Sequence, residues 1–88
     1  MTSAGEVLVY RTKWCGYCRR AAALLSDKHI SFREIDVGGD LQARAWLRAT
    51  TGQRTVPQIF IDGRSIGGYQ ELAALDRSGE LAALLAAR

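Results

Sequence analysis

The only two cysteines of the chain lie close together in the segment Trp14-Cys15-Gly16-Tyr17-Cys18. They follow a strand-like run and open a helix-like run. A helix N-terminus offers unpaired backbone N–H groups and the positive end of the helix dipole, so it favours the thiolate form of Cys15. Cys18 comes one turn later and can attack a mixed disulfide that forms at Cys15. This spacing predicts a dithiol redox site.

Two neighbouring cysteines can also form a zinc site, a structural disulfide or a pair of buried thiols. A structural zinc site normally takes four Cys or His ligands, and His29 is the only further candidate of those types. One disulfide across so short a loop constrains the unfolded chain little, and it is not the dense framework of small secreted domains. These considerations favour redox chemistry, with no metal ligands provided by the chain alone.

The length and composition indicate one small domain over residues 1–88. The 48% hydrophobic content is enough to cover a sheet, and no apolar stretch approaches the length that crosses a membrane. Residues 1–6 do not resemble a secretion signal, so we expect a cytoplasmic protein. The net charge of +3 suits a small anionic substrate. The twelve Lys and Arg residues are spread along the chain, which predicts no nucleic-acid partner.

The hydrophobic periodicity predicts an α/β fold in which strands and helices alternate. A buried strand leads directly into the cysteine-bearing helix, and an Asp-Gly turn joins the last two strands as a hairpin. Together the elements make a four-stranded mixed sheet flanked by helices, in the order βαβαββα with one more C-terminal helix. The strands are expected at 7–10, 31–37, 56–61 and 64–66, and the helices at 15–28, at 41–51 and after Gly67-Gly68.

Three short motifs occur at defined positions relative to these elements. The cysteine segment follows the first strand, Thr55-Val56-Pro57 precedes the third, and Gly67-Gly68 follows the fourth. In this arrangement the chain resembles a glutaredoxin of the dithiol type, with the thioredoxin fold, over essentially its whole length. The resemblance implies glutathione-dependent reduction of protein disulfides and of protein–glutathione mixed disulfides. It also implies that Cys15 is the nucleophile and Cys18 the resolving thiol.

The resemblance further implies a glutathione-binding site beside the cysteines. In this fold the Val56-Pro57 bond is cis, and the backbone of Val56 pairs with an extended thiol peptide as a strand would. The turn at Gly68 brings backbone N–H groups of the next helix to the γ-glutamyl carboxylate. Tyr17 is expected to cover the thiol and flank the substrate. The residues expected to contact glutathione are Tyr17, Gln53, Arg54, Thr55, Val56, Pro57, Gly68, Tyr69 and Gln70.

The sequence departs from the family pattern before the nucleophile. Many members have a lysine three residues earlier, positioned for a glutathione carboxylate, but Thr12 stands there and the lysine is Lys13. Alternation along an extended segment would turn Lys13 to the other side. We therefore expect Arg54 and Gln53 to bind the glycyl carboxylate instead.

A second departure lies at the start of the helix after Gly68. The common pattern has an acidic side chain where Gln70 stands, so a carboxylate that would face the γ-glutamyl ammonium is missing. Glu71 follows directly and is a candidate to replace it.

Two other functions stay open from the sequence. Gly16 stands where many dithiol relatives have proline, and relatives with a small residue there can share a [2Fe–2S] cluster between two subunits and two glutathiones. That alternative would make Cys15 a cluster ligand and the protein a cluster-bridged dimer, whereas the catalyst is expected to be a monomer. The third hypothesis is a redox module for one partner protein that uses a small thiol other than glutathione.

Overall fold

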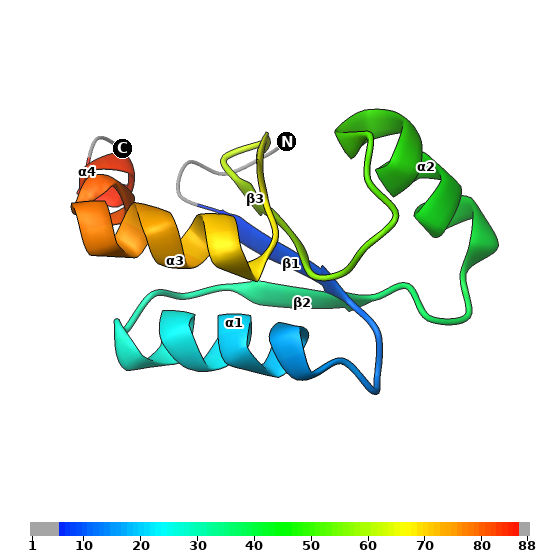
Figure 1. Ribbon diagram of the computed structural model, residues 1–88, viewed down its shortest axis with the longest axis horizontal. Coiled ribbons are helices and arrows are strands. Elements are labelled where there is room, and N and C mark those ends of the chain that lie inside the picture. Colours follow the sequence, from blue (N-terminus) through cyan, green and yellow to red (C-terminus); the bar gives the residue numbers. More distant parts are fainter. Residues whose placement is uncertain (1–5, 87–88) are drawn as a thin grey trace.

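The strands and helices follow one another in the predicted order. The computed structural model describes residues 6–86, and four strands and four helices lie in this part of the chain (Figure 1). None of these helices has the length and apolar character needed to cross a membrane. The elements are β1 (Val7–Arg11), α1 (Gly16–Asp27), β2 (Arg33–Asp36), α2 (Leu41–Thr51), β3 (Gln58–Ile61), β4 (Arg64–Gly67), α3 (Tyr69–Ser78) and α4 (Glu80–Ala86).

The four strands form one sheet in the order β2-β1-β3-β4. The β1–β2 pair is parallel, with Leu8 opposite Arg33, because a helical crossover joins these strands. The β1–β3 and β3–β4 pairs are antiparallel. Asp62 and Gly63 form the β3–β4 turn with φ values of 51° and 85°, the positive values that a tight hairpin requires. The predicted mixed sheet and hairpin are confirmed.

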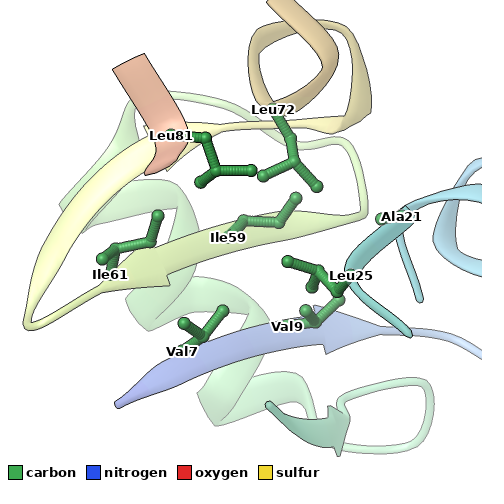
Figure 2. Close-up of a cluster of buried hydrophobic side chains, with 8 residues drawn as sticks. All are labelled: Val7, Val9, Ala21, Leu25, Ile59, Ile61, Leu72 and Leu81. Atoms are coloured by element: carbon green, nitrogen blue, oxygen red, sulfur yellow. The ribbon is translucent and has the colours of Figure 1, made fainter. Parts of the chain in front are cut away.

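The main hydrophobic core lies between one face of the sheet and the helices α1, α3 and α4. Alternate residues of β1 and β3 point to this face, as the two-residue period of a strand requires. Figure 1 shows α1 and α3 side by side, with α2 set apart from them. Burying a leucine side chain in such a core stabilises the fold by about 1.5–3 kcal/mol. The core residues are Val7, Val9, Ala21, Leu25, Ile59, Ile61, Leu72 and Leu81 (Figure 2).

The other face of the sheet carries a smaller core under α2. Its fully buried members are Val37, Leu47 and Phe60. The ring of Phe60 stacks on that of Trp46 at a centroid distance of 5.8 Å, and Tyr10 packs edge-on against Phe60 at 5.4 Å. Helix α2 therefore covers the second face with a few large side chains, while the helices next to the cysteines rest on the larger core.

Some element boundaries differ from the predicted ones. The predicted strand 56–61 begins only at Gln58, because Pro57 has no N–H group to donate to the sheet. The predicted strand 31–37 is limited to 33–36, since Arg33 is paired with Leu8 near the start of β1. These differences leave residues 53–57 as a loop beside the sheet, and this loop is part of the site described below.

Candidate active site

Cys15 lies at the N-terminus of α1, as its position in the sequence predicts. It is the N-cap residue, with extended backbone angles (φ −120°, ψ 108°), and its Sγ atom accepts a hydrogen bond from the Cys18 N–H at 3.1 Å. On its other side the same sulfur donates to the carbonyl oxygen of Val56 at 3.6 Å. Because the sulfur is only half-buried, it is accessible to a substrate while it links the helix to the loop.

Cys18 lies beneath Cys15 and is 2% exposed. Burial raises the pKa of its thiol to about 12, and the hydrogen bond and charge of Cys15 act in the same direction. A hydrogen bond from the Thr12 backbone and the positive charge of Arg11 oppose this rise. Cys18 is therefore a protonated thiol at neutral pH. The two cysteines differ in access to solvent, which suits a half-buried nucleophile and a buried reserve thiol.

A groove with a volume of about 310 Å³ lies beside α1, between loop 53–57 and the start of α3. All the residues predicted to contact glutathione line it except Arg54, although they come from three separate segments. Glu71, the candidate to replace the carboxylate that is missing at Gln70, lines it as well. The lining residues are Tyr17, Gln53, Thr55, Val56, Pro57, Gly68, Tyr69, Gln70 and Glu71.

The loop and α3 meet closely at the Val56-Pro57 bond, which is cis as predicted. A Cβ atom on Gly68 would lie 3.3 Å from the Pro57 carbonyl oxygen, so glycine permits this close approach. Gly67 has a φ of 105°, and a Cβ atom there would lie 2.7 Å from the Glu71 carboxylate. The Gly67-Gly68 pair is therefore required by the geometry of one wall of the groove.

The N-terminus of α3 forms one wall of the groove. The Gly68 N–H donates to Glu71 Oε1 at 2.6 Å, and the next N–H groups along the chain are those of Tyr69 and Gln70. Glu71 thus caps the helix and also places a carboxylate on the groove wall. Its spacing, three residues after the N-cap, is the signal in the sequence that indicates this capping role.

Aromatic rings form the rim of the groove. The rings of Tyr17 and Tyr69 are tilted at 31° to each other with their centroids 6.0 Å apart. The guanidinium of Arg20 lies 5.4 Å from the centre of the Tyr17 ring, a cation–π contact between neighbours on one helix face. Tyr17 remains 51% exposed, so a substrate can pack against it. Arg20 is a positive charge near the groove that the predicted site did not include.

Neither of the two cations considered for the glycyl carboxylate lines this groove. Arg54 is exposed, and its carbonyl oxygen accepts a hydrogen bond from Arg44 Nη2 at 3.3 Å. Lys13 lines a different hollow, together with Trp14 and Asp36. Lys13 lies in a turn and lines the same hollow as Thr12, so it is not turned to the opposite side as alternation along an extended segment predicted. A role for Arg54 stays a prediction.

The two thiols and the cis-proline loop together indicate the chemistry of the protein. They are the parts of a thiol–disulfide oxidoreductase of the thioredoxin fold. A half-buried thiol lies at a helix N-terminus, a second thiol follows one turn later, and the cis-proline loop contacts the first thiol. Within residues 6–86 no three His, Cys, Asp or Glu side chains gather as a metal site.

Comparison with known proteins narrows this class to one family. The sequence matches the glutaredoxin family over residues 7–66. It is 47% identical over 81 residues to a glutaredoxin of Pseudomonas aeruginosa, covering 92% of this chain and 96% of that protein. It is also 47% identical over 80 residues to glutaredoxin 3 of Escherichia coli, covering 91% and 96%. The chain belongs to the glutaredoxin family and is a glutaredoxin-type oxidoreductase.

The comparison of structures agrees with this assignment. A crystal structure of a buckwheat glutaredoxin–glutathione complex superposes with a TM-score of 0.85 at 32% sequence identity. The match covers 91% of this chain and 76% of the buckwheat chain. The predicted thioredoxin fold and the resemblance to glutaredoxins are confirmed.

Proposed function

We propose that the protein uses glutathione to reduce protein–glutathione mixed disulfides, and that it also reduces protein disulfides. The observation that carries the proposal is the groove that lies beside Cys15 and joins Val56, Tyr17 and the start of α3. An extended thiol peptide placed in this groove would have its sulfur next to Cys15 Sγ. The buckwheat relative was solved as a complex with glutathione, which supports the same ligand here.

The first step is attack by the Cys15 thiolate on the glutathione sulfur of a mixed disulfide. A bond forms between Cys15 Sγ and that sulfur, the old disulfide breaks, and the target protein leaves as a thiolate that takes up a proton. The backbone N–H of Cys18 already points at Cys15 Sγ and stabilises negative charge on it before the attack and on its later departure.

The second step regenerates the enzyme. A second glutathione thiolate attacks the glutathione sulfur that is bound to Cys15, which releases glutathione disulfide and the Cys15 thiolate. Two electrons thus pass from glutathione to the target protein. Because this turnover consumes reduced glutathione, we propose that the protein works in a reducing compartment such as the cytoplasm, and as a monomer.

The contact between Cys15 and Val56 changes during this cycle. The Cys15 S–H donates to the Val56 carbonyl oxygen at 3.6 Å, and this donor is lost when the sulfur ionises or enters a disulfide. The oxygen is then available to accept an N–H from an extended thiol peptide. Formation of the mixed disulfide would therefore expose the backbone acceptor that holds the substrate.

Cys18 acts in the reduction of protein disulfides. After Cys15 has bonded to one sulfur of the target, Cys18 attacks Cys15 Sγ and releases the target as a dithiol. Two glutathiones then reduce the Cys15–Cys18 disulfide and leave as glutathione disulfide. While Cys15 is in a disulfide it no longer raises the pKa of Cys18 through its charge, although burial still does. Cys18 must lose its proton before it can attack, and this slows its attack. A second glutathione therefore resolves small mixed disulfides first.

A choice of mixed disulfides tests the proposal. Turnover would be measured with glutathione as the reductant and with a small mixed disulfide of glutathione or, in parallel, of cysteine or cysteinylglycine, which lack the γ-glutamyl group. We expect the glutathione mixed disulfide to give much the highest kcat/KM, because only it presents the γ-glutamyl carboxylate to the start of α3. Equal kcat/KM for all three mixed disulfides would contradict a glutathione site.

We propose a [2Fe–2S] cluster carrier as the second function, on the basis of the open space at Gly16. Apart from its chain neighbours and its own helix backbone, a Cβ atom placed there would meet only Arg19 Nη2, at 3.9 Å, so the surface at Gly16 is open. Since Cys18 is buried, Cys15 offers one accessible thiolate per chain. The remaining ligands would come from a second chain and from two glutathiones.

Anaerobic reconstitution with iron, sulfide and glutathione tests this second function. We expect a brown dimer that forms only with glutathione, and a lower yield from Gly16→Pro, because proline removes a backbone N–H beside the sulfur. A colourless monomer at every glutathione concentration, from protein that remains active in thiol exchange, would leave catalysis as the only function.

A further inference from the structure

Gln58 is a buried polar residue at the edge of the proposed glutathione site. It is 1% exposed and is the only buried polar residue in the part of the chain that the structure describes. It begins β3 directly after the cis-proline, and the three residues that follow it in the strand are all apolar and buried. A glutamine at such a place needs a reason, because a buried amide must form hydrogen bonds to be tolerated.

The amide nitrogen of Gln58 is bonded entirely to loop 53–57. Its Nε2 atom donates to the Thr55 carbonyl oxygen at 2.9 Å and to Gln53 Oε1 at 3.1 Å, and Thr55 Oγ1 lies at 3.4 Å. A backbone carbonyl can only accept, so the contact with Thr55 fixes which end of the amide faces the loop. Both hydrogens of one side-chain amide therefore hold two points of the loop.

The carbonyl oxygen of the same side-chain amide does not hold the loop. Gln58 Oε1 is buried and has no hydrogen-bond partner among the described residues. An apolar side chain of similar size would avoid that desolvation penalty. Core stability alone does not explain why glutamine stands here, whereas the two hydrogen bonds to the loop do.

The loop that Gln58 holds carries the groups next to the nucleophile. Val56 offers the carbonyl oxygen that contacts Cys15 Sγ, and Gln53, Thr55 and Pro57 line the groove. We propose that Gln58 is a positioning residue, which sets the distance and orientation of loop 53–57 for the bound thiol peptide. This inference rests on the proposed use of glutathione and does not place Gln58 in contact with it.

Replacement of the amide by a similar apolar side chain tests the inference. We expect Gln58→Leu to raise the KM for a glutathione mixed disulfide about threefold to tenfold, the effect of losing one or two hydrogen bonds that position the site. The kcat should change much less, because Cys15 and its Cys18 N–H contact are untouched. The matched control is Ile59→Val, which trims the core at the neighbouring strand position and should leave KM unchanged.

A second variant separates positioning from a loss of stability. In Gln58→Glu a protonated carboxyl can still donate to the Thr55 carbonyl, whereas a carboxylate would face two oxygens and be repelled. Burial should raise the pKa of the new carboxyl, so the KM relative to wild type should increase from about pH 6 to about pH 8. A merely structural role would change the unfolding midpoint with pH and leave this KM ratio constant.

The outcomes distinguish this inference from the function on which it rests. Wild-type protein that shows no preference for glutathione would overturn the proposed function. Wild-type protein that prefers glutathione, together with an unchanged KM in Gln58→Leu, would overturn the role of Gln58 alone. If Gln58→Leu does not fold, a KM ratio for Gln58→Glu that is constant with pH overturns it as well.

Discussion

The two sides of the groove are built in different ways. The α1 side consists of neighbouring residues, since Cys15, Tyr17 and Cys18 lie on the first turn of one helix. The opposite side joins loop 53–57 to the start of α3, two segments that meet through a cis-proline and a pair of glycines. The first side holds the sulfur chemistry and the second holds the groups that would recognise the substrate. Substitutions on the first side should therefore change the rate of exchange, and those on the second side should change binding.

The largest expected effect is on the α1 side and separates its two thiols. Cys15→Ser should lower thiol exchange by at least about a thousandfold, because the nucleophile is removed. Cys18→Ser should retain reduction of glutathione mixed disulfides and lose much of the reduction of protein disulfides, which needs both sulfurs. Parallel turnover assays with the two substrates would show this, and equal loss of the first activity in both variants would refute the assignment.

The next effect is on stability at alkaline pH, where the wild type is compared with a variant that lacks the buried Cys18 thiol. Cys18 keeps its proton in the folded state up to about pH 12, whereas the unfolded thiol ionises from about pH 9. The unfolded state therefore binds fewer protons between these values, so the contribution of Cys18 to stability is complete below pH 9 and falls as the pH rises. At about pH 10.5 the loss should reach about 2 kcal/mol.

Denaturant unfolding of the wild type and of Cys18→Ala at several pH values measures this loss. The free energy of unfolding should fall more steeply with pH in the wild type, since other titrating groups are common to both proteins. If the free energy of unfolding falls equally with pH in the two proteins, burial does not raise the pKa of Cys18 in the folded state.

A smaller effect is expected from the recognition side. In Gly68→Ala the new Cβ atom would lie 3.3 Å from the Pro57 carbonyl oxygen and 3.4 Å from the Glu71 carboxylate, so α3 must shift away from the loop. We expect the KM for a glutathione substrate to rise by several-fold, about 1 kcal/mol in binding, with little change in kcat. A fall in kcat at constant KM would show that the side formed by loop 53–57 and α3 affects the rate of exchange and not binding, contrary to the proposed division of roles.

The smallest expected effect compares two cations that lie outside the groove. Removal of an exposed charge changes a binding energy by no more than about 1 kcal/mol, which corresponds to about fivefold. We expect Arg54→Ala to raise the KM for a glutathione substrate more than Lys13→Ala does, with the difference shrinking at high salt. If Lys13→Ala raises the KM more than Arg54→Ala does, the glycyl carboxylate of glutathione binds in the hollow that Lys13 lines.

The same contrast explains how much of the protein could be predicted from its sequence. The order of strands and helices follows from hydrophobic periods, and the place of Cys15 follows from one short segment. The cis bond at Pro57 and the groove around Gly68 were accessible only through resemblance to a family, because their parts lie far apart in the chain.

The parts that sequence reasoning left open or missed depend on where side chains lie in the folded protein. Glu71, a candidate from the sequence, caps α3 and lines the groove, whereas Arg54 does not line it. The buried amide of Gln58 has no signal of its own in an otherwise apolar strand. Only the packed structure shows which loop residues it holds.

Cys15 alone is expected to carry the glutathione intermediate. The most direct test is to treat the wild type, Cys15→Ser and Cys18→Ser with glutathione disulfide and to locate the adduct by intact mass and peptide mapping. Cys18→Ser should gain one glutathionyl group, at Cys15, while Cys15→Ser should gain none because Cys18 is buried and protonated. Adduct at Cys18 in the Cys15→Ser protein, formed as fast as the adduct at Cys15 in Cys18→Ser, would contradict this assignment of Cys15.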